Sequence, residues 1–181
     1  MPREVSKPAK IISFEVSISQ VSNVVLLPGR VGQITIWQEE NVRKLRLNKT
    51  LVGRWEAQTD KGPAVATYQL ISGGTVLLER AEMGADHEMI TAYYVDGNRL
   101  LLTHYCMAGN QPRMQAGSFD PKTNQIDFQF LDATNLPDPK AGHMHNAVFT
   151  FVGPSEVTQN WTFYKDGKPG FTVPLDYHRV D

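Results

Sequence analysis

Residues 87–106 read HEMITAYYVDGNRLLLTHYC, and this pattern points to the architecture of most of the chain. Two runs rich in apolar, aromatic and β-branched residues, His87–Val95 and Arg99–Cys106, flank the tripeptide Asp96-Gly97-Asn98. β-Branched and aromatic residues favour strands, and an Asp-Gly step between two such runs is a strong hairpin signal. The sequence therefore predicts two antiparallel strands joined by a tight turn.

The same succession of strand-like runs and turn residues continues from residue 51 to the end of the sequence. Short connections favour an up-and-down order, and about ten such strands close most simply into a barrel without exposed edges. We therefore expect an all-β, lipocalin-like barrel whose interior has room for a ligand. The candidate strands are Leu51–Gln58, Ala64–Ile71, Thr75–Glu82, His87–Val95, Arg99–Cys106, Arg113–Phe119, Gln125–Asp132, Asn146–Val152, Glu156–Tyr164 and Phe171–Val180.

Length and composition narrow the class of protein further. The 181 residues favour one main domain. Apolar residues make up 41%, and 18 Lys and Arg nearly balance 19 Asp and Glu. This composition excludes a disordered chain and disfavours nucleic acid as a partner. The single cysteine, Cys106, excludes an internal disulfide.

The sequence contains no apolar run long enough to span a membrane and no clear signal peptide. We therefore expect a soluble protein that does not act at a membrane. The compartment stays open at this point, with the cytoplasm favoured.

Residues 1–38 form a predicted N-terminal extension, and residues 39–181 form the predicted barrel domain. Alternating apolar and polar residues around a Pro-Gly turn predict an extra β-hairpin over residues 11–37. Apolar residues at helical spacing predict a short amphipathic plug helix over Gln38–Asn48. Because the apolar face of an appended hairpin must be covered, a homodimer through residues 11–37 is one hypothesis.

A Gly-x-Trp motif, Gly53-Arg54-Trp55, stands between the predicted helix and the first predicted strand. At this junction the motif resembles the lipocalin and fatty-acid-binding-protein superfamily of β-barrels. The resemblance implies that Gly53 ends the helix sharply, that the indole of Trp55 closes the barrel base, and that Arg179 of the last strand lies over it. These three roles are structural.

A longer stretch, residues 102–114, reads LTHYCMAGNQPRM and is followed by SFDP at residues 118–121. It is similar to a bacterial family of lipocalin-like domains of unknown function, over roughly residues 45–180. The resemblance implies a calycin-type barrel with no catalytic chemistry attached. A more distant similarity to nitrobindin-like barrels leaves haem binding as an alternative, with His178 as the candidate ligand.

Polar residues in apolar strands mark the candidate site. Alternation puts His104 and Tyr105 on opposite faces, so one of them should point into the barrel. A cluster of His104, Asn110 and Arg113 either satisfies its own hydrogen bonds or receives a ligand carboxylate or carbonyl. Glu79 interrupts an apolar strand, and Arg113 is its predicted partner across the barrel.

We expect the cavity to bind a small hydrophobic or amphipathic molecule, with no cofactor and no metal. The predicted ligand-binding residues are Glu79, Tyr93, His104, Asn110, Arg113, Met114 and Trp161.

Two other classes of function stay open. An enzyme could use His104 as acid or base, with Glu79 to orient it. A filled barrel could instead serve as an interaction module. His143 and His145 share one face of an extended loop, but they would need a third ligand to hold a metal.

Overall fold

The computed structural model describes residues 50–60, 62–84 and 87–180. The plug helix predicted over Gln38–Asn48 lies outside the described residues. The same holds for the hairpin predicted over residues 11–37 and for the homodimer that it would form.

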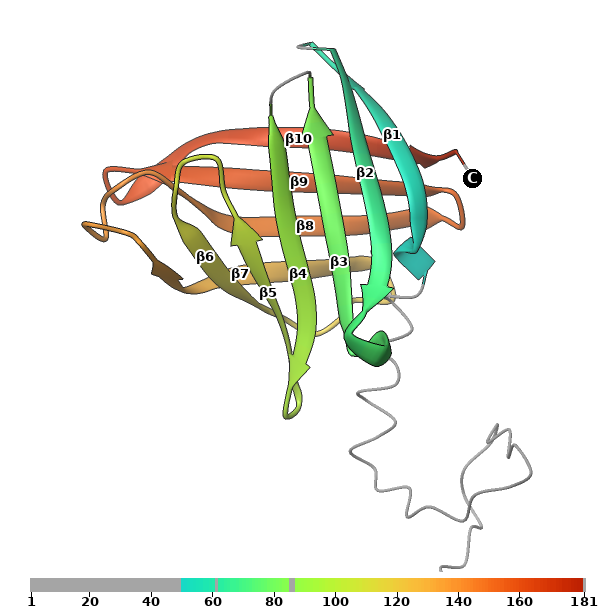
Figure 1. Ribbon diagram of the computed structural model, residues 1–181, viewed down its shortest axis with the longest axis horizontal. Helices are drawn as coiled ribbons and strands as arrows, with labels where there is room; N and C mark the ends of the chain where they lie inside the picture. The colour runs from blue at the N-terminus through green and yellow to red at the C-terminus, as the bar shows by residue number, and fades with distance from the viewer. Residues whose placement is uncertain (1–49, 61, 85–86, 181) are drawn as a thin grey trace, which may run out of the picture. The chain divides into compact units, whose positions relative to one another are not determined.

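Ten strands account for the fold of the described residues and close into one barrel (Figure 1). Each strand pairs antiparallel with the next in sequence, and the last returns to pair with the first. This confirms the predicted all-β, up-and-down barrel of about ten strands. The strands are β1 (Gly53–Thr59), β2 (Gly62–Ile71), β3 (Val76–Met83), β4 (Glu88–Asp96), β5 (Arg99–Tyr105), β6 (Gln111–Ala116), β7 (Gln125–Thr134), β8 (His143–Gly153), β9 (Glu156–Lys165) and β10 (Lys168–Arg179).

Tight turns between strands explain why the chain reverses where it does. Between β9 and β10, Asp166 and Gly167 have φ angles of 55° and 73°. Two successive residues with positive φ characterise the type I′ turn, whose twist matches that of the flanking strands. The Asp-Gly step at residues 166–167 thus marks the hairpin between β9 and β10, as these residue types predict.

The start of β8 differs from the sequence prediction. This strand begins at His143, three residues before the predicted start at Asn146 and within the extended loop that the sequence predicts around His143 and His145. Its pairing with β9 shifts between Met144 and Asn146, so that His145 has no partner in the register. Such a bulge interrupts the alternation by which a strand is recognised. The loop prediction is thus wrong for residues 143–145, which belong to β8.

A stacked pair of side chains closes the barrel where the chain enters β1. Trp55 is buried, and its indole Nε1 donates to the carbonyl of Leu51 at 2.7 Å. Arg179 lies over the ring, with its guanidinium carbon 4.2 Å from the ring centroid, and donates to the carbonyl of Val52 at 2.6 Å. Gly53 has a φ of 125°, a conformation that favours glycine. The contact expected between Arg179 and Trp55 is therefore formed.

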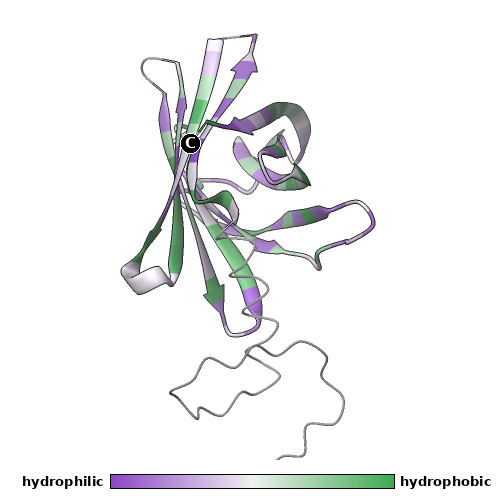
Figure 2. Ribbon diagram, turned by 90° about the vertical axis from the view of Figure 1, so that its right-hand side faces the viewer, coloured by the Kyte–Doolittle hydropathy of each residue, from purple (hydrophilic) through white to green (hydrophobic). Residues whose placement is uncertain are grey.

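The barrel interior is filled largely by side chains. Hydrophobic and hydrophilic residues alternate along the strands, as Figure 2 shows, so that one set faces inward. The inward set includes the fully buried rings of Tyr68, Tyr93, Phe149 and Tyr177. These rings occupy much of the wide lumen expected of ten strands.

Candidate ligand-binding cavity

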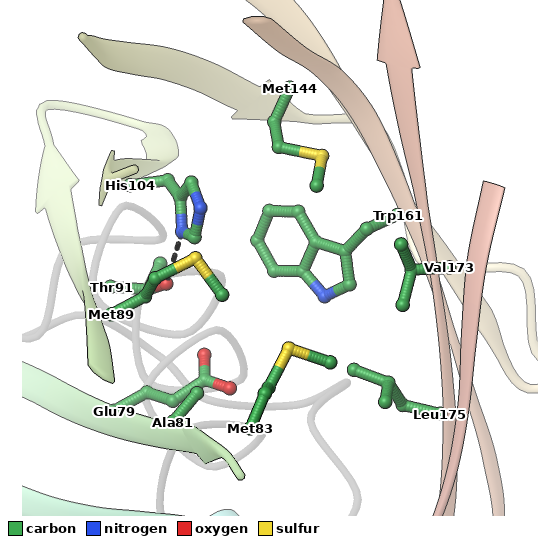
Figure 3. Close-up of a pocket in the computed structure, with 10 residues that line it drawn as sticks. All are labelled: Glu79, Ala81, Met83, Met89, Thr91, His104, Met144, Trp161, Val173 and Leu175. Carbon is green, nitrogen blue, oxygen red and sulfur yellow. Dashed lines mark hydrogen bonds between the residues drawn. The ribbon is translucent and has the colours of Figure 1, made fainter. Parts of the chain in front are cut away.

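A cavity of about 40 Å³ lies inside the barrel, toward the end where β3 turns into β4 (Figure 3). Three polar residues, Glu79, Thr91 and His104, contribute to its wall. The rest of the lining is apolar and consists of Ala81, Met83, Met89, Met144, Trp161, Val173 and Leu175. At ~10–15 Å³ per water, the volume holds only a few water molecules.

The polar wall belongs to a row of residues that crosses four neighbouring strands. The register pairs Tyr68 of β2 with Glu79 of β3, Glu79 with Thr91 of β4, and Thr91 with His104 of β5. Directly opposed residues on neighbouring strands share a face and lie within contact distance. The hairpins thus bring residues that are far apart in the sequence side by side inside the barrel.

Glu79 sits at the centre of this row and is buried. The hydroxyl of Tyr93 donates to its Oε2 at 2.5 Å. Burial raises the pKa of Glu79 from 4.5 to about 6, although donation from Tyr93, Tyr68 and Thr91 acts in the opposite direction. At neutral pH the group is therefore mainly a carboxylate, and hydroxyl donors compensate for part of its lost hydration.

A second chain of hydrogen bonds reaches the row from the opposite wall. Trp161 Nε1 donates to Gln159 Oε1 at 2.9 Å, and the Gln159 amide donates to the hydroxyl oxygen of Tyr68. Gln159 is fully buried, and these contacts use both ends of its side chain. These hydrogen bonds thus link Trp161 to Tyr68, which is the register partner of Glu79.

His104 ends the row and differs from its neighbours in one respect. Its Nδ1 lies 2.9 Å from Thr91 Oγ1, whereas its Nε2 is buried without a hydrogen-bond partner. In Figure 3 this second ring nitrogen is on the side of the ring that faces Trp161. Burial lowers the pKa of His104 from 6.5 to about 4, so the imidazole is neutral at neutral pH. Its neighbour Tyr105 is exposed, so His104 is the residue of that pair that points inward.

Three of the predicted ligand-binding residues line the cavity: Glu79, His104 and Trp161. Tyr93 is connected to it through its hydrogen bond with Glu79. Met114 is fully buried in the hydrophobic core and is not part of the lining.

The other two predicted anchors lie elsewhere. Arg113 is half exposed and forms an ion pair with Asp132, with its Nε 2.6 Å from Asp132 Oδ1. The predicted pair of Arg113 with Glu79 is therefore not formed. Asn110 is buried in the connection between β5 and β6, where its amide donates to the carbonyl of Gly142 at 2.8 Å. This bond ties two connections of the barrel together.

The remaining histidines do not form a cofactor site with the cavity. His178 is exposed, 3.6 Å from Glu156, and cannot ligate a haem held inside the barrel. His143 Nε2 lies 2.9 Å from His145 Nδ1, and the His145 ring stacks on Tyr164 with the centroids 3.9 Å apart. Within residues 50–60, 62–84 and 87–180, no group of three His, Cys, Asp or Glu side chains is placed to hold a metal ion.

Sequence reasoning missed Tyr68, Thr91 and Gln159, which complete the hydrogen-bond network. It also missed Met83 and Met144 of the apolar wall. Pairing the strands through their turns would have placed Tyr68 and Thr91 on either side of Glu79. No comparable local signal distinguishes Gln159 from other polar residues on strands.

The sequence matches no model of a protein family, and a search of curated proteins finds no significant match. The described part of the chain has no helix with the length and apolar character needed to cross a membrane.

Proposed function

We propose that the barrel binds a small molecule that has an apolar body and one polar end, without turning it over. The observation that carries the proposal is Nε2 of His104, a buried polar atom with no partner, in a wall that is apolar apart from His104, Glu79 and Thr91. An unsatisfied buried donor or acceptor costs roughly 1–3 kcal/mol. A bound molecule would supply the missing partner and cover the apolar wall.

The proposal includes a place among lipocalin-like binding barrels. The closed barrel supports it, as does the contact of Arg179 with Trp55 at the base. Both are features that the resemblance of the sequence implies. Membership of the bacterial lipocalin-like family is part of the same proposal.

The size of the cavity sets a condition on binding. Pockets for drug-sized molecules measure about 300–1,000 Å³, far more than the space present here. Three methionines, Met83, Met89 and Met144, line the cavity. Methionine is unbranched and has three rotatable side-chain bonds, so it adapts readily to a change in shape. We propose that these side chains move aside to admit the ligand.

Nuclear magnetic resonance of ¹³C-methyl methionine tests the proposal directly, with hexan-1-ol as the probe. Binding should shift the methyl signals of Met83, Met89 and Met144. The signals of exposed Met107 and fully buried Met114 should not move, since neither residue lines the cavity. The proposal fails if all of these signals respond alike or none responds.

A variant that fills the cavity should lose the binding that the methionine signals report. Ala81 lines the cavity, so Ala81→Leu should occupy the space and weaken hexan-1-ol binding at least about tenfold, the loss of roughly 1.4 kcal/mol of binding free energy. Ala108→Leu makes the same change at an exposed turn and should leave the affinity unchanged. Equal affinities of both variants would contradict binding in the cavity.

The enzymatic alternative is less well supported by the geometry. A general base works best with a pKa near the working pH. The pKa of His104 is lowered to about 4, so its ring accepts a proton only weakly at neutral pH. Its Nδ1 contacts Thr91, and the hydrogen bond of Glu79 is made with Tyr93, so Glu79 does not orient the imidazole directly.

A further inference from the structure

A buried carboxylate, that of Glu79, forms part of the cavity wall, and only 2% of the residue is exposed. In Figure 3 it points from β3 into the space between Met83 and Met89. The hydroxyl of Tyr93 donates to its Oε2 at 2.5 Å. A hydroxyl group is neutral, so this bond replaces lost hydration but does not balance a negative charge. The ionised group therefore leaves the cavity negative.

The described part of the chain supplies no cation to balance this charge. None of the residues that line the cavity is Lys or Arg, and no described Lys or Arg forms an ion pair with Glu79. Arg80, the next residue along β3, is exposed and pairs with Glu88. Arg113, the cation that the sequence leads us to expect here, pairs with Asp132 at the surface. The carboxylate is thus buried without a counter-ion.

His104 is the other titratable side chain of the wall, and its contacts fit a neutral ring. An imidazolium donates from both ring nitrogens, but Nε2 is buried with no partner. Protonation would therefore bury an unpaired charged donor, which costs more than an unpaired neutral group. The contact between Nδ1 and Thr91 Oγ1 fits either neutral tautomer, because a hydroxyl both donates and accepts. His104 can thus present a lone pair to a ligand, but it does not balance the charge of Glu79.

The indole ring of Trp161 is a second feature suited to a cation. Its N–H donates to Gln159 Oε1 at 2.9 Å, so the part left for a ligand is the ring itself. An aromatic ring attracts a cation that approaches its face, and tryptophan does so most strongly. Trp161 of β9 and Glu79 of β3 come from strands that are not neighbours, and both line the same space. A cation in this space would meet the carboxylate and the ring together.

The energetic balance favours a cation over an anion. Folding has already taken the carboxylate out of water, so a ligand cation loses only its own hydration and gains a partner at short range. An anion would add a second negative charge to the same buried space. The apolar remainder of the wall suits an alkyl chain. A primary ammonium group is about as large as a water molecule, so the present volume of about 40 Å³ admits it.

We propose that the polar end of the ligand is a primary ammonium group and that Glu79 is its counter-ion. The class of ligand is then an alkylamine with a short apolar chain, and carboxylate anions are selected against. This inference rests on the proposed function, because it names the class of ligand for the same cavity.

Selectivity is tested by calorimetry with three probes that share one chain length: hexan-1-amine, hexan-1-ol and hexanoate. The titrations are run slightly above neutral pH, where an alkylamine carries its proton. The amine should bind at least about tenfold tighter than the alcohol, as expected for a hydrogen bond between charged groups in place of a neutral one. Hexanoate should bind more weakly than either.

The role of Glu79 is tested by Glu79→Gln, which keeps the shape of the side chain and removes its charge. Affinity for hexan-1-amine should fall about a hundredfold, because the ammonium group would be buried without a partner. Affinity for hexan-1-ol should change less than about threefold, which also shows that the variant is folded. Glu156→Gln makes the same change at an exposed position and should leave both affinities unchanged.

The outcomes separate the two proposals. If hexan-1-ol or hexanoate binds as tightly as the amine, or if Glu79→Gln keeps full affinity for the amine, the ammonium assignment is wrong and the binding function stands. If no probe binds and no methionine signal shifts, the binding function fails, and the inference about its ligand fails with it. Should Glu79→Gln not fold, the comparison of the three probes in the unsubstituted protein decides the inference.

Discussion

Two buried tryptophans of the barrel, Trp55 and Trp161, have contrasting surroundings. At Trp55, the indole N–H donates to Leu51, and Arg179 covers the ring while donating to a backbone carbonyl. At Trp161, the indole N–H is also satisfied, but the neighbouring ring of His104, with its centroid 5.0 Å away, keeps an unpaired nitrogen. The polar groups named at Trp55 thus have hydrogen-bond partners, whereas one ring nitrogen beside Trp161 has none.

This contrast suggests that the residues around Trp55 serve the stability of the fold and that those around Trp161 serve the proposed binding function. Sequences that only have to fold satisfy their buried polar groups, and departures from this rule concentrate at functional sites. The contacts at Trp55 join the chain entering β1 to the end of β10 and so complete the closure of the barrel. The polar row at Glu79 and His104 adds no such closure, because the strands that carry it are already joined by short hairpins.

The largest effect on the free energy of unfolding is expected when the side chain of Trp55 is removed from the base of the barrel. Trp55→Ala should lower the free energy of unfolding by about 3–5 kcal/mol, since it leaves a large cavity and removes the ring under Arg179. Denaturant unfolding measures this loss. A loss below about 1 kcal/mol would show that the base contributes no more than an ordinary position.

The next effect concerns Glu79 and the dependence of stability on pH. Its pKa is raised from 4.5 to about 6 in the folded state, so between these values the folded protein keeps a proton that the unfolded chain loses. The contribution of Glu79 to the free energy of unfolding therefore falls as the pH rises through this window, by about 2 kcal/mol. Above it the contribution is constant.

His104 acts in the opposite sense, because its pKa is lowered from 6.5 to about 4 and its contribution rises with pH over that range. The Glu79→Gln variant loses only the contribution of Glu79, which falls as the pH rises, and keeps that of His104. The difference in unfolding free energy between the unsubstituted protein and this variant should therefore fall across pH 4.5 to 6. A difference that is flat over this window, measured by denaturant unfolding at each pH, would contradict a buried carboxylate with a raised pKa.

The fold could be predicted from the sequence because each hairpin carries its own signal. Asp166 and Gly167 adopt the positive φ angles that their residue types favour, and the strands on either side pair as expected. The bulge at His145 could not be predicted, since it depends on how β8 pairs with β9 and not on the composition of β8.

The site could be predicted only in part. Glu79 and His104 stand out as polar residues among apolar neighbours, and both line the cavity. Arg113 and Met114 are consecutive residues of one strand and must point to opposite faces, so they could not both have been ligand contacts inside the barrel. Thr91 is identified only through the register of two hairpins, which links it to both Glu79 and His104.

A smaller effect on stability, with a large effect on binding, is expected at His104. In His104→Leu an apolar side chain replaces one that leaves Nε2 unpaired, so the loss of the Thr91 contact is partly offset. The free energy of unfolding at neutral pH should change by less than about 1 kcal/mol. Hexan-1-ol affinity should fall, because the variant removes Nε2, the polar partner proposed for the ligand. A loss above about 3 kcal/mol would instead assign His104 a structural role like that of Trp55.

The smallest effect on the free energy of unfolding is expected at Arg113. Its substitution compares the outer surface of the barrel with the cavity. Its ion pair with Asp132 is about half exposed, with side-chain exposures of 41% and 50%. Surface ion pairs of this kind contribute about 0–1 kcal/mol, because solvent screens the charges and ordering two long side chains opposes the gain. Arg113→Ala should therefore lower the unfolding free energy only slightly and leave hexan-1-ol affinity unchanged. Asp132→Asn should have the same small effect on stability, since it breaks the same pair. A tenfold loss of affinity in Arg113→Ala alone would mean that the outer surface takes part in binding.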